Sequence, residues 1–271
     1  MTIFAGKTAL VTGAATGLGR ALAEELGRRG AVVYVSALTQ AEAEPVAENI
    51  RQSGAVAHAI KLDVREIADI ESAMDQICAA NGRLDYVFNN AGIVFIGEFR
   101  EMRPTQIENL IATNFTGPSL IMLCAFQRMR AQGGGHIVNT ASHGGLMPVA
   151  TMAMYSGTKH GIVGLSTSLR AEAAPDNVRI STICMGFVES SLIRSADKGE
   201  GADKGIAAIL PIKPWPAARA ADRVLRGVVR NEPLILFPVY VKLAWWLHRI
   251  SPWLSNWMIA KSFETYCKAR S

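Results

Sequence analysis

The chain has 271 residues, of which 49% are hydrophobic and 19% are charged, a composition typical of one large packed domain. Its net charge of +5 arises in residues 213–271, which hold 10 Lys and Arg against 3 Asp and Glu, together with all five tryptophans. These basic residues are interleaved with bulky apolar ones and no nucleic-acid-binding motif is visible, so a nucleic-acid partner is excluded.

The four cysteines are scattered at Cys78, Cys124, Cys184 and Cys267. They form no CxxC pair and have no metal-like spacing with histidine, so we expect no metal site and a reducing, cytoplasmic environment. A strand-like run begins at Thr8, and we therefore expect no signal peptide before it.

The apolar run Thr8–Thr12 is predicted to be a buried strand, and Arg20–Arg29 a helix. Gly13, Gly17 and Gly19 lie between them. This is the layout of a dinucleotide site, because glycines let the backbone approach a pyrophosphate and the helix N-terminus attracts its charge. A plain tight turn is the alternative interpretation.

A second strand is predicted over Ala31–Ser36. At the end of this strand an Asp or Glu would bind the ribose diol of NAD. The chain instead has Ser36, Ala37, Leu38 and Thr39, with no carboxylate and no Arg to clasp a 2′-phosphate, but its small hydroxyl residues leave space for that phosphate. We therefore favour NADP(H) as cofactor, with NAD(H) as the alternative.

A helix over Glu42–Ser53 and a third strand over Val56–Leu62 are predicted next. Asp63 follows this strand and is expected to hydrogen-bond the adenine amino group. Apolar residues at helical spacing predict a further helix over Ile67–Ala80.

The fourth predicted strand, Leu84–Phe88, is followed by Asn89, Asn90, Ala91 and Gly92. Small residues at this point allow the chain to pass under a flat ring.

A long helix is predicted over Pro104–Met129, with Asn114 amid its apolar face. Two roles are open for this buried amide: hydrogen bonding within the core, or support of a water relay.

Ser142 follows directly after a fifth predicted strand, His136–Thr140. It therefore lies at the carboxyl end of a strand, where ligands bind in open α/β sheets. Tyr155 and Lys159 are four residues apart on a predicted helix, so their side chains share one face. A nearby ammonium favours the phenolate, which makes the pair a plausible proton donor and its tuner.

Strands over Val178–Cys184 and Leu234–Phe237 complete the pattern. Alternating strands and helices predict a mostly parallel sheet covered on both faces. Residues 190–215 are expected to be a substrate lid, and the part Ser190–Gly205 shows no core pattern; an exposed loop without a role is the alternative.

Together these motifs resemble the short-chain dehydrogenase/reductase family over Thr8 to Ser190. The resemblance implies an α/β, single-domain Rossmann-type fold, a doubly wound, seven-stranded parallel sheet with helices on both faces, which we assign to residues 1–237. From the pattern of the tail itself we expect a C-terminal helical extension over residues 238–271. The resemblance also implies NAD(P)-dependent oxidation of alcohols or reduction of carbonyls, and a homodimer or homotetramer.

By the same resemblance, Tyr155 would exchange a proton with the substrate oxygen and Lys159 would lower the pKa of that tyrosine and hold the nicotinamide ribose. Ser142 would polarise the carbonyl, and Asn114 would hold a water that links Lys159 to solvent. Residues expected to bind cofactor are Gly13, Thr16, Gly17, Leu18, Gly19, Ala37, Leu38, Thr39, Asp63, Val64, Asn90, Ala91, Gly92, Tyr155, Lys159, Gly186, Val188 and Ser190.

The chain departs from the family pattern at two positions. Met185 stands before Gly186 where a proline is common, so the loop lacks a rigid φ restraint and nicotinamide placement is expected to be looser. Ala37 replaces the acid that selects NAD in many members.

Residues expected to flank the substrate are all apolar: Val94, Phe95, Leu146, Met147, Met152, Phe187, Leu192 and Ile193. We therefore expect an alcohol dehydrogenase or ketone reductase acting on a bulky hydrophobic secondary alcohol and its ketone. A non-catalytic dinucleotide-binding sensor or scaffold is the alternative.

The C-terminal extension carries two helix-like runs, Val239–Ile250 and Trp253–Tyr266, rich in tryptophan and basic residues. Its apolar run is too short to span a bilayer. Three interpretations are open: it packs on the same domain, on a partner subunit or on a membrane surface, so that the protein is cytoplasmic or membrane-associated.

Overall fold

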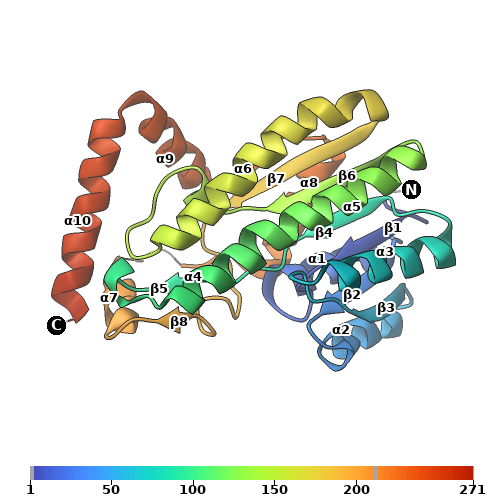
Figure 1. Cartoon of the computed structure of the whole chain (residues 1–271), viewed down its shortest axis with the longest axis horizontal. Coiled ribbons are helices and arrows are strands. Elements are labelled where there is room, and N and C mark those ends of the chain that lie inside the picture. The colour runs from blue at the N-terminus through green and yellow to red at the C-terminus, as the bar shows by residue number, and fades with distance from the viewer. Residues whose placement is uncertain (1–2, 210–212, 271) are drawn as a thin grey trace.

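The computed structural model describes residues 3–209 and 213–270 and confirms the predicted α/β architecture (Figure 1). Seven parallel strands form one sheet in the order β3-β2-β1-β4-β6-β7-β9. Their bounds are β1 Thr8–Val11, β2 Val32–Ala37, β3 Val56–Lys61, β4 Tyr86–Asn89, β6 Gly135–Thr140, β7 Val178–Met185 and β9 Leu234–Phe237. The strand order reverses between β1 and β4, which opens a crevice at the carboxyl ends of the strands.

The sheet divides the hydrophobic core into two layers, as strand β1 shows. Ala9 and Val11 point into one layer and Leu10 into the other, because successive side chains of a strand alternate between faces. Both faces are covered by helices, so the strands carry almost continuous apolar sequence.

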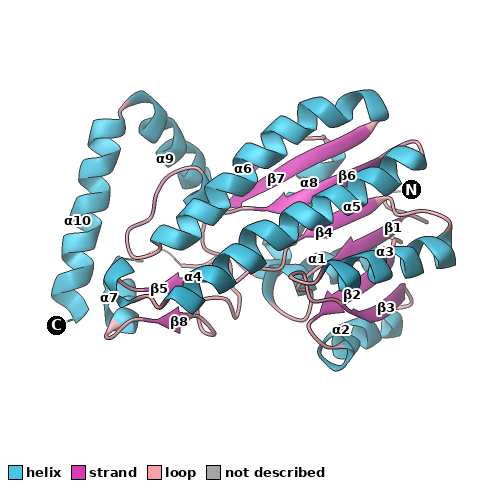
Figure 2. Cartoon of the chain, in the orientation of Figure 1, coloured by secondary structure: helices cyan, strands magenta, loops and turns pink. Residues whose placement is uncertain are grey.

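Helices cover both faces of the sheet (Figure 2). One layer contains α1 (Gly17–Arg28), α2 (Gln40–Gln52) and α8 (Ala217–Val229). The other contains α3 (Ile67–Asn81), α5 (Gly117–Ala131) and α6 (Ala153–Ala173). In α1 the buried Leu22 and Leu26 are four residues apart, the spacing that places apolar side chains on one helical face.

The helix predicted over Pro104–Met129 is continuous but not uniform. It consists of α4 (Pro104–Ile111), a π-helical segment η2 (Ala112–Thr116) and α5. Its 28 residues would be long and apolar enough to cross a membrane by length and composition alone. A core helix meets the same criterion, and buried Leu110, Ile121 and Met129 identify this one as such.

The segment Ser190–Gly205, for which no core pattern was found, is more ordered than expected. Asp197–Lys198 forms strand β8, which pairs with β5 (Phe95–Ile96) in a separate two-stranded parallel sheet. Helix α7 (Ala202–Ile209) follows and buries Ala202 and Ile206. Local sequence does not indicate this order, because Ala202 and Ile206 are buried only by packing with α10 from the C-terminus. Residues 210–212 of the expected lid lie outside the described residues.

That partner is the C-terminal extension, which forms α9 (Val239–Ile250) and α10 (Pro252–Arg270). Helix α10 runs beside α7 at one end of the molecule (Figure 1). Gly205 of α7 lies against the ring of Tyr266, which is fully buried. A side chain at Gly205 would overlap that ring, so the close approach of the two helices requires glycine there.

Candidate active site

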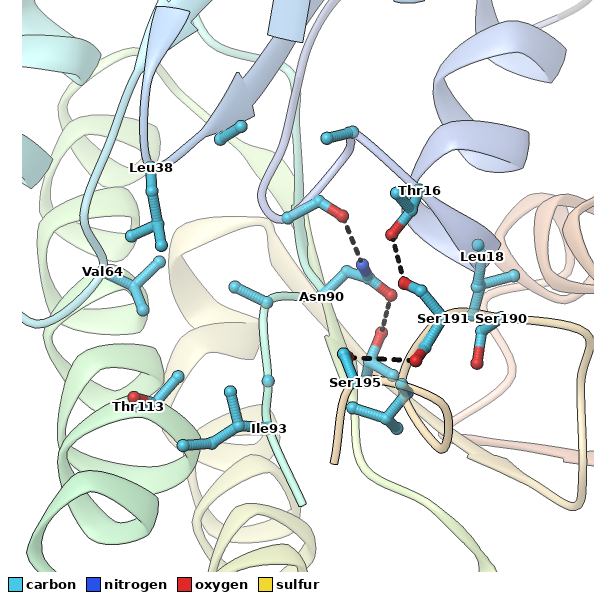
Figure 3. Close-up of a pocket in the computed structure, with 18 of the residues that line it drawn as sticks. Thr16, Leu18, Leu38, Val64, Asn90, Ile93, Thr113, Ser190, Ser191 and Ser195 are labelled. Atoms are coloured by element: carbon cyan, nitrogen blue, oxygen red, sulfur yellow. Dashed lines mark hydrogen bonds between the residues drawn. The ribbon is translucent and has the colours of Figure 1, made fainter. Parts of the chain in front are cut away.

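A cavity of about 390 Å³ opens at the carboxyl ends of the strands. Its walls come from the loops after β1, β2, β3, β4 and β6 and from residues 190–195. In Figure 3, Leu38 and Val64 lie on one side, Thr16 and Ser191 on the other, and Asn90 between them. This is the crevice in which open α/β sheets bind their ligands.

The glycine turn after β1 has a shape that side chains would fill. Gly13 has φ +60°, and a Cβ there would lie 2.8 Å from Ala91 Cα. Gly17 has φ +56°, and its Cβ would lie 2.8 Å from Ser190 Cβ; a Cβ on Gly19 would overlap the Gly13 carbonyl oxygen. The turn therefore presents bare backbone at the start of α1, which suits a pyrophosphate.

Thr12 ties this turn to the loop after β4. Its hydroxyl oxygen accepts hydrogen bonds from the backbone N–H of Asn90 (2.9 Å) and of Ala91 (3.0 Å). The Asn90 side chain in turn donates to the Thr12 carbonyl (3.1 Å) and accepts from the Thr140 hydroxyl (3.3 Å). Asn90 thus links the ends of three strands. Thr12 and Thr140 were not among the expected site residues, although Thr12 directly precedes the glycine turn.

The far end of the cavity combines apolar and charged residues. Ala37, Leu38 and Val64 line it, with Glu42 and Arg65 nearby. The Asp63 carboxylate accepts from the Arg65 guanidinium at 2.6 Å, and this bond holds the pKa of Asp63 below its usual value. Thr39 caps α2 by accepting from the Glu42 N–H. Arg65, Asp63 and Glu42 therefore together set the charge at this end of the cavity, and Arg65 is partly neutralised by Asp63.

Tyr155 on α6 and Ser142 after β6 meet at the other end of the cavity. Both are buried, at 9% and 7% exposed. Burial raises the pKa of the Tyr155 phenol, and a hydrogen bond with Ser142 opposes this rise. The expected lowering of the Tyr155 pKa by Lys159 does not outweigh burial. At neutral pH Tyr155 is therefore a phenol and a proton donor.

Lys159 lies one turn along α6, as predicted, and is 3% exposed. Its Nζ donates to the Thr140 carbonyl at 2.9 Å and lies 5.7 Å from the centre of the Tyr155 ring. Burial lowers the pKa of Lys159 to about 8. A Cβ at Gly92 would lie 3.2 Å from Asn114 Oδ1, a tight approach, and in ordinary contact with Nζ at 3.5 Å.

Asn114 is fully buried in the π-helical segment. Its Oδ1 accepts from the Ile93 N–H and its Nδ2 donates to the Ile93 carbonyl, both at 2.8 Å. The side chain therefore holds the loop after β4 in place beside Gly92 and Lys159. These two hydrogen bonds give Asn114 a structural role. Its role in a water relay stays a prediction.

The loop after β7 lacks the common proline but is restrained in another way. Trp215 and the Phe187–Glu189 segment exchange two backbone hydrogen bonds of 2.9 Å. The Phe187 N–H also donates to the hydroxyl of Tyr240 on α9 at 3.2 Å. Gly186 packs so closely on that hydroxyl that a Cβ would overlap it. The expected looseness is therefore countered by Tyr240, a residue of the C-terminal extension that sequence reasoning did not assign to the site.

The expected substrate residues are only partly brought together. Val94 and Met152 form an apolar cluster with Tyr155, and Leu192 and Ile193 pack on it. Leu146 instead belongs to the main core layer, and Phe95 is buried in β5 outside this cluster. Phe187 packs edge-on against His143, with ring centres 5.5 Å apart. Met147 is half-buried, and its backbone N–H donates to the His143 carbonyl at 3.1 Å.

The remaining members of the apolar cluster come from distant parts of the chain. Ile96, Ala202, Ile206 and Tyr266 belong to the same cluster as Tyr155. Sequence reasoning missed them because they belong to the β5–β8 sheet, α7 and α10. His143, next to Ser142, is a further unforeseen neighbour, and burial lowers the pKa of its imidazole. No cluster of metal-ligating side chains is found among residues 3–209 and 213–270.

Fold and site together define a dinucleotide-binding α/β oxidoreductase with a buried tyrosine–lysine pair. The family model for short chain dehydrogenase matches residues 7–201. The chain therefore belongs to the short-chain dehydrogenase family.

Among curated relatives, the uncharacterized oxidoreductase YxjF of Bacillus subtilis is 36% identical over 189 residues, covering 70% of this chain and 74% of its own length. The 3-oxoacyl-acyl-carrier-protein reductase FabG of Escherichia coli is 33% identical over 208 residues, covering 77% and 83%. A dehydrogenase/reductase SDR family protein 7-like of Drosophila melanogaster is 28% identical over 261 residues, covering 94% and 80%.

Two solved structures extend the comparison. A Burkholderia phymatum short chain dehydrogenase/reductase in complex with NAD superposes with a TM-score of 0.86 at 24% identity, covering 94% of this chain and 96% of its own, and supports the fold. A metagenomic short-chain oxidoreductase in complex with NADP superposes with a TM-score of 0.71 at 28% identity, covering 86% and 97%.

Proposed function

We propose that this protein interconverts a bulky hydrophobic secondary alcohol and its ketone. The supporting observation is the apolar cluster that meets the cofactor cavity at Tyr155 and Leu192. Val94, Ile96 and Met152 are buried around the proton donor, and none of them offers a hydrogen-bond partner to a sugar hydroxyl. Lipophilic ketones fit such a surface better than polyols.

The residues of the site divide the chemistry between them. When bound, the nicotinamide supplies or accepts the hydride at the carbonyl carbon. In reduction, Tyr155 gives its phenolic proton to the carbonyl oxygen as the C=O double bond becomes a C–O single bond. Ser142 hydrogen-bonds the same oxygen, and Lys159 places a positive charge beside the phenolate that forms. Because burial raises the pKa of Tyr155, neutral pH favours ketone reduction and alkaline pH favours alcohol oxidation.

NADP(H) is the proposed cofactor. No carboxylate directly follows β2, and the Arg65 guanidinium lines the same end of the cavity. A 2′-phosphate would be attracted by Arg65 and repelled by Glu42, so the preference over NAD(H) is expected to be modest.

Residues 190–209, with β8 and α7, are proposed to cover the bound substrate. Thr16 Oγ1 and Ser191 Oγ lie 2.8 Å apart, which places the start of this segment against the glycine turn (Figure 3). Leu192 and Ile193 then lead into the apolar cluster. Closure here would exclude water from the reacting groups.

The Tyr155→Phe variant tests this function. It is expected to lower the rate of ketone reduction by a factor of about 10²–10⁴, since a positioned proton donor contributes that much, while cofactor binding persists. Tyr86→Phe, at another buried tyrosine, is the matched control. Full activity of Tyr155→Phe would refute the assigned chemistry. Cofactor binding without turnover by the unaltered protein would favour a sensor or scaffold instead.

A substrate panel tests the proposed specificity. It contains lipophilic ketones, a 3-oxoacyl thioester and polyols, each assayed with NADPH or NADH for the carbonyls and with the oxidised cofactors for the polyols. We expect the highest kcat/KM with lipophilic ketones. A kcat/KM for a polyol above that of every ketone would overturn the proposal, whereas a preference for the thioester would place the protein functionally beside its FabG relatives.

A further inference from the structure

An exposed apolar stripe runs along α9 and continues onto α10. Its members are between 48% and 78% exposed: Val239, Leu243, Trp246, Ile250, Trp253 and Trp257. On α9 they recur at spacings of four, three and four residues, which aligns them on a single helical face. Water-exposed apolar side chains are common singly, but a contiguous stripe marks an interaction surface.

The stripe is held on a firmly packed support. On the opposite side of α9, Val241 is buried and Tyr240 is bonded to Phe187 in the loop after β7. His248 Nδ1 lies 3.0 Å from Ser255 Oγ, which joins α9 to α10 across their turn. This turn forms a corner of the molecule, away from the seven-stranded sheet (Figure 1). The stripe therefore has a fixed shape and faces outward.

The exposed charged residues of α9 are all positive. Lys242 and Arg249 are exposed on α9, and α9 contains no Asp or Glu. The Arg249 guanidinium lies over the Trp245 ring, 5.3 Å from its centre. On α10, the exposed Lys261 forms an ion pair with Glu264 at 2.8 Å. An occupant of this surface must therefore present apolar groups together with negative charge.

A second copy of the chain fits these charges poorly. A two-fold contact brings the same patch of both subunits together. The cationic flanks of two α9 helices would then meet with no acidic residue on either helix to balance them, whereas paired helices usually carry opposite charges beside their apolar seam.

We propose that the α9–α10 stripe docks this protein onto the surface of an anionic membrane. Tryptophan rings favour the boundary between headgroups and acyl chains, and lysine and arginine beside them attract anionic lipids. Helix α9 is about 18 Å long, too short to span a bilayer, so it lies in the plane of the interface. Because Tyr240 of α9 contacts Phe187 beside Ser142, docking places the active site close to the lipid; the docking itself does not depend on the proposed substrate.

Vesicle co-sedimentation of the full chain tests the proposal. The vesicles are pure phosphatidylcholine or phosphatidylcholine mixed with phosphatidylglycerol, each at low and at high salt. Binding is expected to the anionic vesicles at low salt and to weaken at high salt. Equal binding to both lipids, or no binding to either, overturns the proposal.

Two double variants separate the apolar and charged contributions. Ile250→Ser/Trp253→Ser is expected to weaken binding about 100-fold, since both side chains leave the interface. Lys242→Ala/Arg249→Ala is expected to weaken it about 30-fold at low salt, and less at high salt. The controls Ile67→Ser on α3 and Arg20→Ala/Arg130→Ala alter exposed apolar and basic residues elsewhere, and both should bind as the unaltered chain does.

Folding and self-association are checked on the same proteins. Each variant should keep its circular dichroism spectrum and its affinity for NADPH, because all altered residues are exposed. Sedimentation equilibrium without lipid measures the subunit number. If Ile250→Ser/Trp253→Ser lowers the mass of the assembly and no vesicle binding is seen, the stripe covers a second copy and the membrane proposal is wrong.

Discussion

The Arg270 guanidinium, at the end of α10, bonds the Glu101 carboxylate at 2.6 Å across 169 positions of sequence, and it bonds Glu98 at 2.7 Å. This contact closes a ring: Glu101 lies in η1 (Phe99–Glu101), directly after β5. Strand β5 pairs with β8, and α7 behind it packs on α10. The C-terminal extension thus supports the segment that is proposed to cover the substrate.

Removal of the Arg270 ion pairs is expected to make the segment proposed to cover the substrate more mobile. Arg270→Ala is expected to speed limited proteolysis within residues 197–205 and to raise KM for a lipophilic ketone about threefold to tenfold, because local opening becomes easier. The affinity for NADPH should change little. The control is Lys261→Ala, which breaks an exposed ion pair with Glu264 on the same helix. Identical cleavage of both variants would show that Arg270 does not hold the segment.

The burial of Lys159 is expected to lower the free energy of unfolding, although the residue is needed for catalysis. Burial lowers its pKa from 10.5 to about 8, so the unfolded chain holds this proton more tightly than the folded one. Lys159→Met is therefore expected to raise the free energy of unfolding at pH 7 by about 1–2 kcal/mol, after allowance for the lost bond to the Thr140 carbonyl, while kcat falls at least about 100-fold.

The stability gained by Lys159→Met is expected to depend on pH. Between pH 8 and pH 10.5 the unfolded state binds more protons at Lys159 than the folded state, so stability of the unaltered chain rises with pH there. The advantage of Lys159→Met should be complete below pH 8 and shrink toward pH 10.5. Urea unfolding at several pH values measures it, and an advantage that grew with pH would contradict the burial argument.

Thr12 is expected to set cofactor affinity through the loop after β4. Thr12→Val keeps the shape of the side chain but strands the N–H groups of Asn90 and Ala91. The expected loss is about 1–2 kcal/mol of folding stability and about tenfold in NADPH affinity, measured by thermal unfolding and fluorescence titration. Thr167→Val, on the exposed face of α6, is the control. If both variants bind NADPH with equal affinity, Thr12 does not contribute to cofactor binding.

Cofactor selectivity should follow the charges at Arg65 and Glu42. Arg65→Ala is expected to raise KM for NADPH about threefold to fivefold and Glu42→Gln to lower it by a similar factor, as befits charges near the surface. The KM for NADH should move little, because NADH lacks the 2′-phosphate. Steady-state kinetics with both cofactors checks this, and parallel shifts for NADPH and NADH would place both residues away from the ribose.

Much of the fold follows from local sequence. Apolar periodicity and glycine turns predict strands such as Val178–Met185 and helices such as Gly17–Arg28. The alternation of strands and helices is compatible with few topologies. The core of the site was also predictable. Tyr155 and Lys159 share a helix, and Ser142 ends a strand, so their positions depend on short stretches of chain.

Contacts between distant segments were decided only by tertiary structure. Ala202 and Ile206 are buried because Tyr266 covers them, and Tyr240 restrains Phe187 because α9 returns to the end of β7. The periodicity of the local sequence does not predict contacts between such distant segments. The pKa of Tyr155 belongs to the same class: sequence suggested a lowering by Lys159, but the depth of burial, a property of the whole fold, raises it. Sequence alone thus determined the reaction class and the catalytic pair through short-range spacing, whereas the surroundings of that pair depend on side chains that folding brings together from more than 50 residues away.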